Sequence, residues 1–193
     1  ISQGSRGREV GDRPKVTEPT AQLPPRAGML WPLRSLDLMT MDETALLLAL
    51  DTCEFLFLTE IGEPEANRLR LVVEEGRVVG KPSRVELGHG RSIDDVRAIE
   101  VVPHSQRFEL IWDHYISYAV HNESYQSWDD AEAWSGNLFR RYSRSKFLEY
   151  LGRATFADTR YPGPFTHYQV ICQDHVIDIA ALQSPKVRLP GPS

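Results

Sequence analysis

The chain has 193 residues, an apolar fraction of 41% and a charged fraction of 25%, values typical of a globular domain that buries its own core. Its 22 basic and 27 acidic residues give a net charge of −5, and this disfavours a broad nucleic-acid-binding surface, which needs clustered lysine and arginine. No segment approaches the roughly 18 uncharged apolar residues of a membrane-spanning helix. We therefore expect a soluble, cytoplasmic protein without a membrane partner.

Residues 1–35 differ in composition from the rest of the chain. They contain five prolines, several arginines and glycines, and no apolar periodicity. Such a segment buries too little apolar surface to offset the entropy lost on ordering. The sequence predicts a flexible arm rich in Pro, Gly and Arg at 1–35, followed by a single domain at 36–193.

The first part of this domain predicts one helix and a hairpin. Thr40 or Asp42 is a candidate N-cap for a helix over 43–51. The aromatic run at 53–59 predicts a strand that ends in a turn at 61–64, and 68–75 alternates as its hairpin partner. Weaker strands are expected at 84–87 and 97–102, on either side of a turn at 89–92.

Residues 107–121 alternate between apolar and polar side chains, which is typical of a strand that buries one face. An unbroken strand of this length would span roughly 50 Å. A domain of this size has a radius of gyration near 15 Å, so we predict a bend near Asp113 to Tyr115.

The last part of the chain predicts a connector, a helix and two strands. Residues 127–137 are acidic and aromatic, and Ser143 or Ser145 is a candidate cap for a helix over about 146–156. The apolar runs at 168–172 and 176–182 require a turn or bulge between them. The whole pattern favours an α+β fold, a mainly antiparallel sheet with one or two covering helices.

Two histidines and a glutamate are the candidate catalytic residues. Strand spacing places His121 and Glu123 on one face, where they could act in general acid–base catalysis. The alternative is a strand end whose polar groups form turn hydrogen bonds. His114 shares the apolar face of its strand, where it is either a hydrogen-bonded core residue or part of a concavity at the bend.

Basic residues near the predicted helix start form a candidate anion-binding site, consisting of Arg140, Arg141 and Arg144 with Lys146 nearby. The alternative is that they pair with the acidic connector.

Metal and cofactor signatures are weak in this sequence. His167, His175, Asp174 and Asp178 could bind a divalent ion, but no zinc-site spacing occurs, and no metal site is expected. The sequence also lacks a phosphate-binding glycine loop, a serine-hydrolase elbow and a dinucleotide fingerprint, so no cofactor is expected. Cys53 and Cys172 lie in apolar runs and are expected to be free thiols.

These observations leave three hypotheses. The first is a non-catalytic module, of immunity or adaptor type, that binds another protein through an acidic and aromatic surface. Its candidate partner-binding residues are Trp128, Asp129, Asp130, Glu132 and Trp134. The second is a small enzyme that acts on a phosphorylated or nucleotide-like ligand, with His121 or His114, Glu123 and the arginine group. The third is a sheet protein that holds a small apolar ligand.

Short motifs across about residues 97–182 resemble those of a family of bacterial proteins with no assigned activity. These motifs are Trp112-Asp113, Asn122-Glu123-Ser124-Tyr125, Phe139-Arg140, Tyr142-Ser143, Phe147-Leu148, Thr155-Phe156-Ala157, Tyr161-Pro162-Gly163-Pro164 and His167-Tyr168. The resemblance implies a soluble bacterial protein and supplies no catalytic residues.

Overall fold

The computed structural model describes residues 42–127 and 129–190, which form an α+β unit dominated by antiparallel strands. The predicted fold class is confirmed. The elements in chain order are α1 (Glu43–Asp51), β1 (Phe55–Glu65), β2 (Arg68–Gly88), β3 (Arg91–Glu100), β4 (Arg107–Trp112), β5 (Tyr115–Asn122), the 3₁₀ turn η1 (Glu123–Tyr125), β6 (Ala133–Ser135), β7 (Phe139–Arg144), α2 (Lys146–Ala154), β8 (Thr166–Ile171), β9 (His175–Ala181) and β10 (Lys186–Arg188). The predicted N-terminal arm at 1–35 lies outside the described residues.

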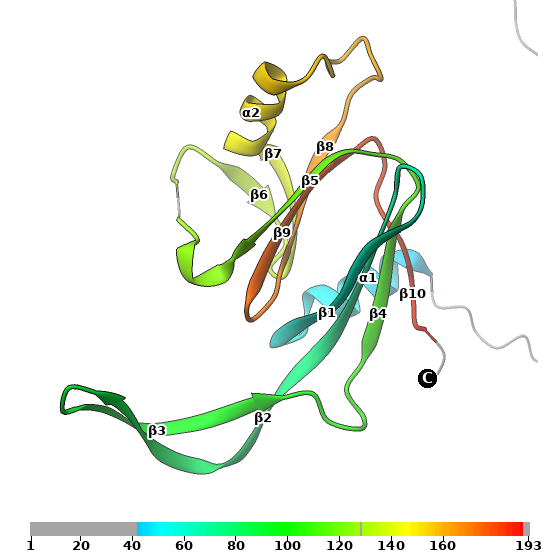
Figure 1. Ribbon diagram of the computed structural model, residues 1–193. Helices are drawn as coiled ribbons and strands as arrows, with labels where there is room; N and C mark the ends of the chain where they lie inside the picture. Colours follow the sequence, from blue (N-terminus) through cyan, green and yellow to red (C-terminus); the bar gives the residue numbers. More distant parts are fainter. Residues whose placement is uncertain (1–41, 128, 191–193) are drawn as a thin grey trace, which may run out of the picture. The chain divides into compact units, whose positions relative to one another are not determined.

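The strands form two sheets rather than the single sheet that was expected (Figure 1). The first sheet has the order β1-β2-β4-β10, with β3 paired to the far part of β2, and the second has the order β5-β9-β8-β7-β6. The predicted bend is confirmed, because β4 ends at Trp112, β5 begins at Tyr115, and the two strands belong to different sheets. One alternating segment thus supplies a strand to each sheet.

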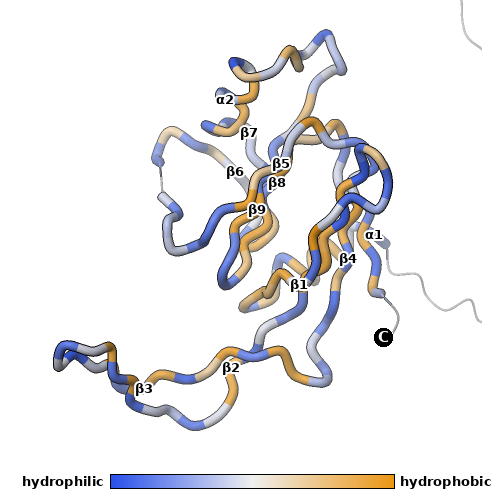
Figure 2. Tube along the Cα trace, in the orientation of Figure 1, coloured by the Kyte–Doolittle hydropathy of each residue, from blue (hydrophilic) through white to orange (hydrophobic). Residues whose placement is uncertain are grey.

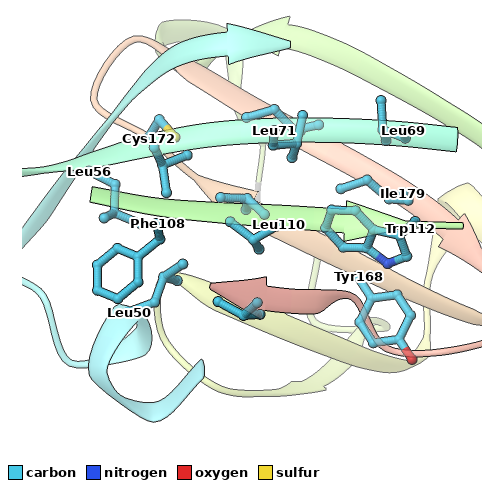
Figure 3. Packing of buried hydrophobic residues seen from close by; sticks show 14 of the residues in the cluster. Leu50, Leu56, Leu69, Leu71, Phe108, Leu110, Trp112, Tyr168, Cys172 and Ile179 are labelled. Atoms are coloured by element: carbon cyan, nitrogen blue, oxygen red, sulfur yellow. The ribbon is translucent and has the colours of Figure 1, made fainter. Parts of the chain in front are cut away.

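The hydrophobic core lies between the inner faces of these sheets and is closed by α1 (Figure 3). Leu69 and Leu71 on β2 lie opposite Trp112 and Leu110 on β4. All four side chains are buried, and together with Ile179 of the second sheet they belong to one cluster. The alternation that predicted these strands therefore marks the face that packs inward.

Several predicted boundaries are corrected by the structure. β1 continues through the expected turn at 61–64 and ends at Glu65. The strand expected at 84–87 is instead the far end of β2, and its partner β3 begins at Arg91. Helix α2 ends at Ala154, two residues before its predicted end, and Ser145 is its N-cap.

The outer face of the first sheet is a ladder of ion pairs. Glu109 on β4 is only 3% exposed and accepts hydrogen bonds from Arg188 on β10 and from Arg70 on β2. These two guanidinium groups hold the pKa of Glu109 below its usual range, and Arg188 has the larger effect. Arg70 and Arg107 also share Glu60 of β1, at 2.6 Å each. The charges on this face are used to join its strands.

Candidate functional site

The outer face of the second sheet carries buried polar side chains. On β8, His167 and Gln169 alternate with the core residues Tyr168 and Val170, so they point away from the core. Their neighbours on β9 are Ala180 and Asp178, and their neighbours on β7 are Tyr142 and Arg140. The strand register thus places imidazole, carboxylate, amide, phenol and guanidinium groups side by side.

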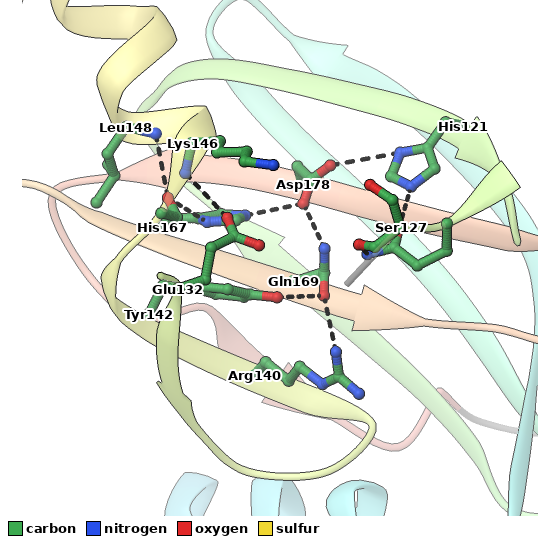
Figure 4. Close-up of polar contacts among 12 residues, drawn as sticks. His121, Ser127, Glu132, Arg140, Tyr142, Lys146, Leu148, His167, Gln169 and Asp178 are labelled. Atoms are coloured by element: carbon green, nitrogen blue, oxygen red, sulfur yellow. Dashed lines mark hydrogen bonds and ion pairs between the residues drawn. The ribbon is translucent and has the colours of Figure 1, made fainter. Parts of the chain in front are cut away.

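A chain of hydrogen bonds runs from α2 to β5 across this face (Figure 4). The hydroxyl of Ser145 lies 2.9 Å from Nδ1 of His167, and Nε2 of His167 lies 2.9 Å from Oδ1 of Asp178. The same Oδ1 accepts a hydrogen bond of 2.7 Å from Gln169, while Oδ2 of Asp178 lies 3.4 Å from Nδ1 of His121. One carboxylate therefore makes polar contacts with the side chains of three residues.

A second branch extends from Gln169 to β6. Its Oε1 accepts hydrogen bonds from the Tyr142 hydroxyl at 2.9 Å and from Arg140 at 3.5 Å. Arg140 also donates to the carbonyl of Asn137, and its guanidinium lies 4.9 Å from the centre of the Trp134 ring. Burial raises the pKa of Tyr142, so its hydroxyl remains a proton donor at neutral pH.

The order serine, histidine, aspartate is that of a hydrolase triad, in which the serine hydroxyl attacks a carbonyl carbon. Here Ser145 is 2% exposed and sits on Nδ1 of His167 rather than on Nε2. Its Oγ also accepts the N–H of Leu148, and the first N–H of α2 donates to Glu132. The hydroxyl and the helix amides beside it are therefore occupied.

The ring of His167 is closed off as well. Tyr142 stacks on it at 4.3 Å, and Phe147 of α2 lies 5.0 Å away, both measured between ring centres. His167 itself is 2% exposed. The hydrogen bonds from Ser145 through His167 to Asp178 thus join α2 to the sheet. The Ser145 hydroxyl is buried, so a substrate cannot reach it.

The three predicted catalytic residues occupy separate places. His121 lies on β5, where it contacts Asp178 and Gln126. Glu123 does not continue that strand, as strand spacing had suggested, because β5 ends at Asn122 and Glu123 begins η1. Glu123 lines a pocket with Leu56 and Cys172, whereas His114 lines a different pocket, of about 200 Å³, beside Trp112 and Lys186. Their catalytic role stays a prediction.

The three predicted anion-binding arginines also diverge. Arg140 and Arg141 are neighbours on β7 and therefore point to opposite faces. Arg140 is buried in the polar network, whereas Arg141 is exposed. Arg144, at the end of the strand, donates to the carbonyl of Ala131. The structure does not bring these guanidinium groups together.

The predicted partner-binding residues are partly used inside the fold. Asp129 pairs with Lys146 at 2.6 Å, and Glu132 accepts the N–H of Lys146. The hydrogen bond from Lys146 is the main reason that the pKa of Asp129 lies below its usual range. Trp134 packs against Tyr142 and is 38% exposed. Asp130 is exposed, and Trp128 lies outside the described residues.

A further candidate surface is the projecting hairpin, which we define as residues 77–100 of β2 and β3. Figure 1 shows that it extends away from both sheets, and Figure 2 shows apolar segments along it. Within the described part of the chain, these residues pair only with each other. An isolated two-stranded ribbon is marginally stable in water, so a hairpin in this position is expected to need a contact with another surface.

One face of the projecting hairpin carries a stripe of aliphatic residues. Val85 lies opposite Ile93, and Ser83 lies opposite Val96. Ile93 and Val96 therefore share a face although three positions separate them, because Asp95, with φ 61°, is an extra residue in the ladder. The stripe consists of Val79, Val85, Leu87, Ile93, Val96 and Ala98.

This stripe has no cover among the described residues. Val85, Leu87 and Ile93 are 40%, 58% and 51% exposed. The opposite face carries Val78 and Ile99 at its base and charges farther out, where Arg84 pairs with Glu86 at 3.1 Å and with Asp94 at 3.7 Å. The outer part of the hairpin is therefore amphipathic, a pattern typical of a sheet face that packs against another surface.

Comparisons with known protein families, with curated proteins and with solved structures find no match to this chain. Among residues 42–127 and 129–190, no helix is long and apolar enough to cross a membrane. The same residues hold no group of three or more potential metal ligands. Cys53 and Cys172 are free thiols, as predicted, and burial raises the pKa of Cys172 to about 12, so this thiol is unreactive at neutral pH.

Proposed function

We propose that this chain is a non-catalytic protein-binding module of immunity or adaptor type, and that the projecting hairpin is its docking element. The observation that carries the proposal is the aliphatic stripe, because three of its large side chains are 40% exposed or more. Alternating apolar residues on a two-stranded ribbon gain stability only when another surface covers them. A partner protein supplies that surface.

The acidic connector is a weaker docking candidate than the hairpin. Asp129 and Glu132 already bind Lys146, and Trp134 is stacked against Arg140 and Tyr142. A partner would have to compete with these internal contacts. Trp134 and Asp130, which are exposed, are proposed as the rim of the interface rather than its centre.

The enzyme alternative has less support, because its acid–base residues and its arginines face different parts of the unit. General acid–base catalysis requires the participating groups to reach one substrate by hydrogen bonds. We also propose a cytoplasmic location for the protein, which agrees with two buried free thiols.

Site-specific photo-cross-linking in cells that express the full chain tests this proposal. A photo-reactive benzophenone amino acid is placed at Ile93 on the stripe or, as the control, at Leu48, which is 64% exposed on α1. We expect discrete protein adducts from position 93 and not from position 48. Equal labelling from both positions, or none from position 93, would contradict the proposal.

A further inference from the structure

We infer that the open edge of β3 pairs with the same edge of a second copy of this chain, antiparallel and around a twofold axis. This inference rests on the proposed function, since it assigns a partner to the edge of the same hairpin and leaves the stripe face of both copies open to the partner protein. Within the described residues, β3 bonds only to β2, so its other edge presents unpaired backbone groups. Such an edge is a template for a strand from another chain.

The faces of β3 restrict the register of this pairing. Residues that lie opposite each other must point to the same face of the joined sheet. Because Asp95 is an extra residue, Ile93 and Ala98 lie on the stripe face, whereas Asp94 and Arg97 lie on the charged face. Near the centre of β3 the numbers of facing residues must therefore add to 189 or 191, because a sum of 193 would place Val96 of the stripe opposite Arg97 of the charged face.

The charges of β3 select one of these registers. When the numbers add to 191, Arg91 faces Glu100 and Asp94 faces Arg97. The twofold axis doubles both pairs, so every charge of β3 except Asp95 then meets an opposite charge. In the register that adds to 189, Asp94 faces Asp95, so like charges meet instead.

The charge distribution over the rest of the unit agrees with this arrangement. The projecting hairpin contains five basic and four acidic residues, whereas the other residues after 41 contain 11 basic and 19 acidic residues. In the selected register the base of one hairpin lies beside the tip of the other. The two acidic bodies are then at opposite ends of the four-stranded sheet, where their repulsion is weakest.

Three of the four charges in this register are available. Within residues 42–127 and 129–190, Arg91, Arg97 and Glu100 form no ion pair, and Asp94 has only the 3.7 Å contact with Arg84. A strand of ten residues covers less surface than a standard interface of about 1,600 Å². The dimer is therefore weak and depends on protein concentration.

Charge reversal with sedimentation equilibrium on the full chain tests this inference. The wild type is expected to pass from monomer to dimer as its concentration rises through the micromolar range. Asp94→Arg and Arg97→Asp each place like charges opposite each other, and each is expected to weaken the dimer about tenfold or more. The double variant Asp94→Arg with Arg97→Asp restores opposite charges and is expected to recover the dimer.

Arg153→Asp is the matched control, because it makes the same charge change as Arg97→Asp on an exposed residue of α2. A dimer that resists both single reversals, or a double variant that stays monomeric, would overturn the β3 register. A monomer at every concentration would overturn self-pairing altogether. In that case adducts at Ile93 to a different protein would still support the proposed function.

Discussion

The outer face of the second sheet and the projecting hairpin are both built from strands in which apolar and polar residues alternate, but they differ in which residues are buried. On the sheet, polar groups are buried, and the carboxylate of Asp178 contacts the side chains of His167, Gln169 and His121. On the hairpin, aliphatic groups are exposed, and no described residue covers Leu87 or Ile93. The first region is therefore satisfied by this chain's own side chains, whereas the second has no cover among the described residues.

The largest contrast is expected between an isoleucine of the hydrophobic core and one of the projecting hairpin. Ile179→Ala empties a fully buried site and should destabilise the fold by about 3 to 4 kcal/mol. Ile93→Ala removes the same atoms from a side chain that is 51% exposed and should change stability by less than about 0.5 kcal/mol. Urea unfolding of both variants measures this difference, and similar losses would refute the contrast.

Removal of the shared carboxylate should have the next largest effect. Asp178→Ala leaves the side-chain donors of His167 and Gln169 buried without an acceptor, at a cost of about 2 to 3 kcal/mol. Asp174→Ala, in the exposed turn before β9, is the control and should be nearly neutral. Thermal unfolding compares the two, and an unchanged Asp178→Ala variant would show that the network is not stabilising.

The ion-pair ladder of the first sheet should give a smaller and pH-dependent effect. Arg188 and Arg70 lower the pKa of Glu109 in the folded state, so the stabilisation is fully present above the unfolded value of about 4.3. Glu109→Gln should lose about 1 to 2 kcal/mol at neutral pH. The difference in unfolding free energy between the variant and the wild type should disappear as the pH falls below about 4.3 and through the pKa of Glu109 in the folded state. A difference that is constant with pH would contradict the ion-pair explanation.

The smallest effect on stability is expected at the tip of the stripe. Leu87→Asp should leave the melting temperature almost unchanged, because this side chain is 58% exposed. The same variant should sharply reduce the photo-adducts formed from position 93, since it places a charge in the docking face. Arg84→Gln on the charged face provides the comparison and should keep those adducts.

The sequence predicted the features that depend on local pattern. Both helices, the bend after Trp112 and the turn before β9 follow from periodicity, capping and chain length. The polar network could not be predicted in the same way, because Ser145, His167 and Asp178 come from three elements whose register only the fold determines. The one available signal was the lone charge of Asp178 within an apolar run.

The stripe on the projecting hairpin escaped prediction for a different reason. Asp95 shifts the parity of the apolar residues on β3, and on β2 residues 80–82 interrupt the ladder between Val79 and Val85. Read as sequence, β2 therefore seemed to end near 75. The pairing shows the common face, because Val85 lies opposite Ile93 and Ser83 lies opposite Val96.

Hydrogen–deuterium exchange over a range of protein concentrations shows whether the β3 edge is open in the monomer and covered on association. In dilute solution the amides of β3 should exchange quickly and those of β9 slowly, because β9 lies inside its sheet with neighbours on both sides. At high concentration the β3 amides should slow, whereas those of β5, the edge of the second sheet, should not change. Exchange in β3 as slow as in β9 at the lowest concentration, or no slowing at the highest, would contradict an uncovered docking edge.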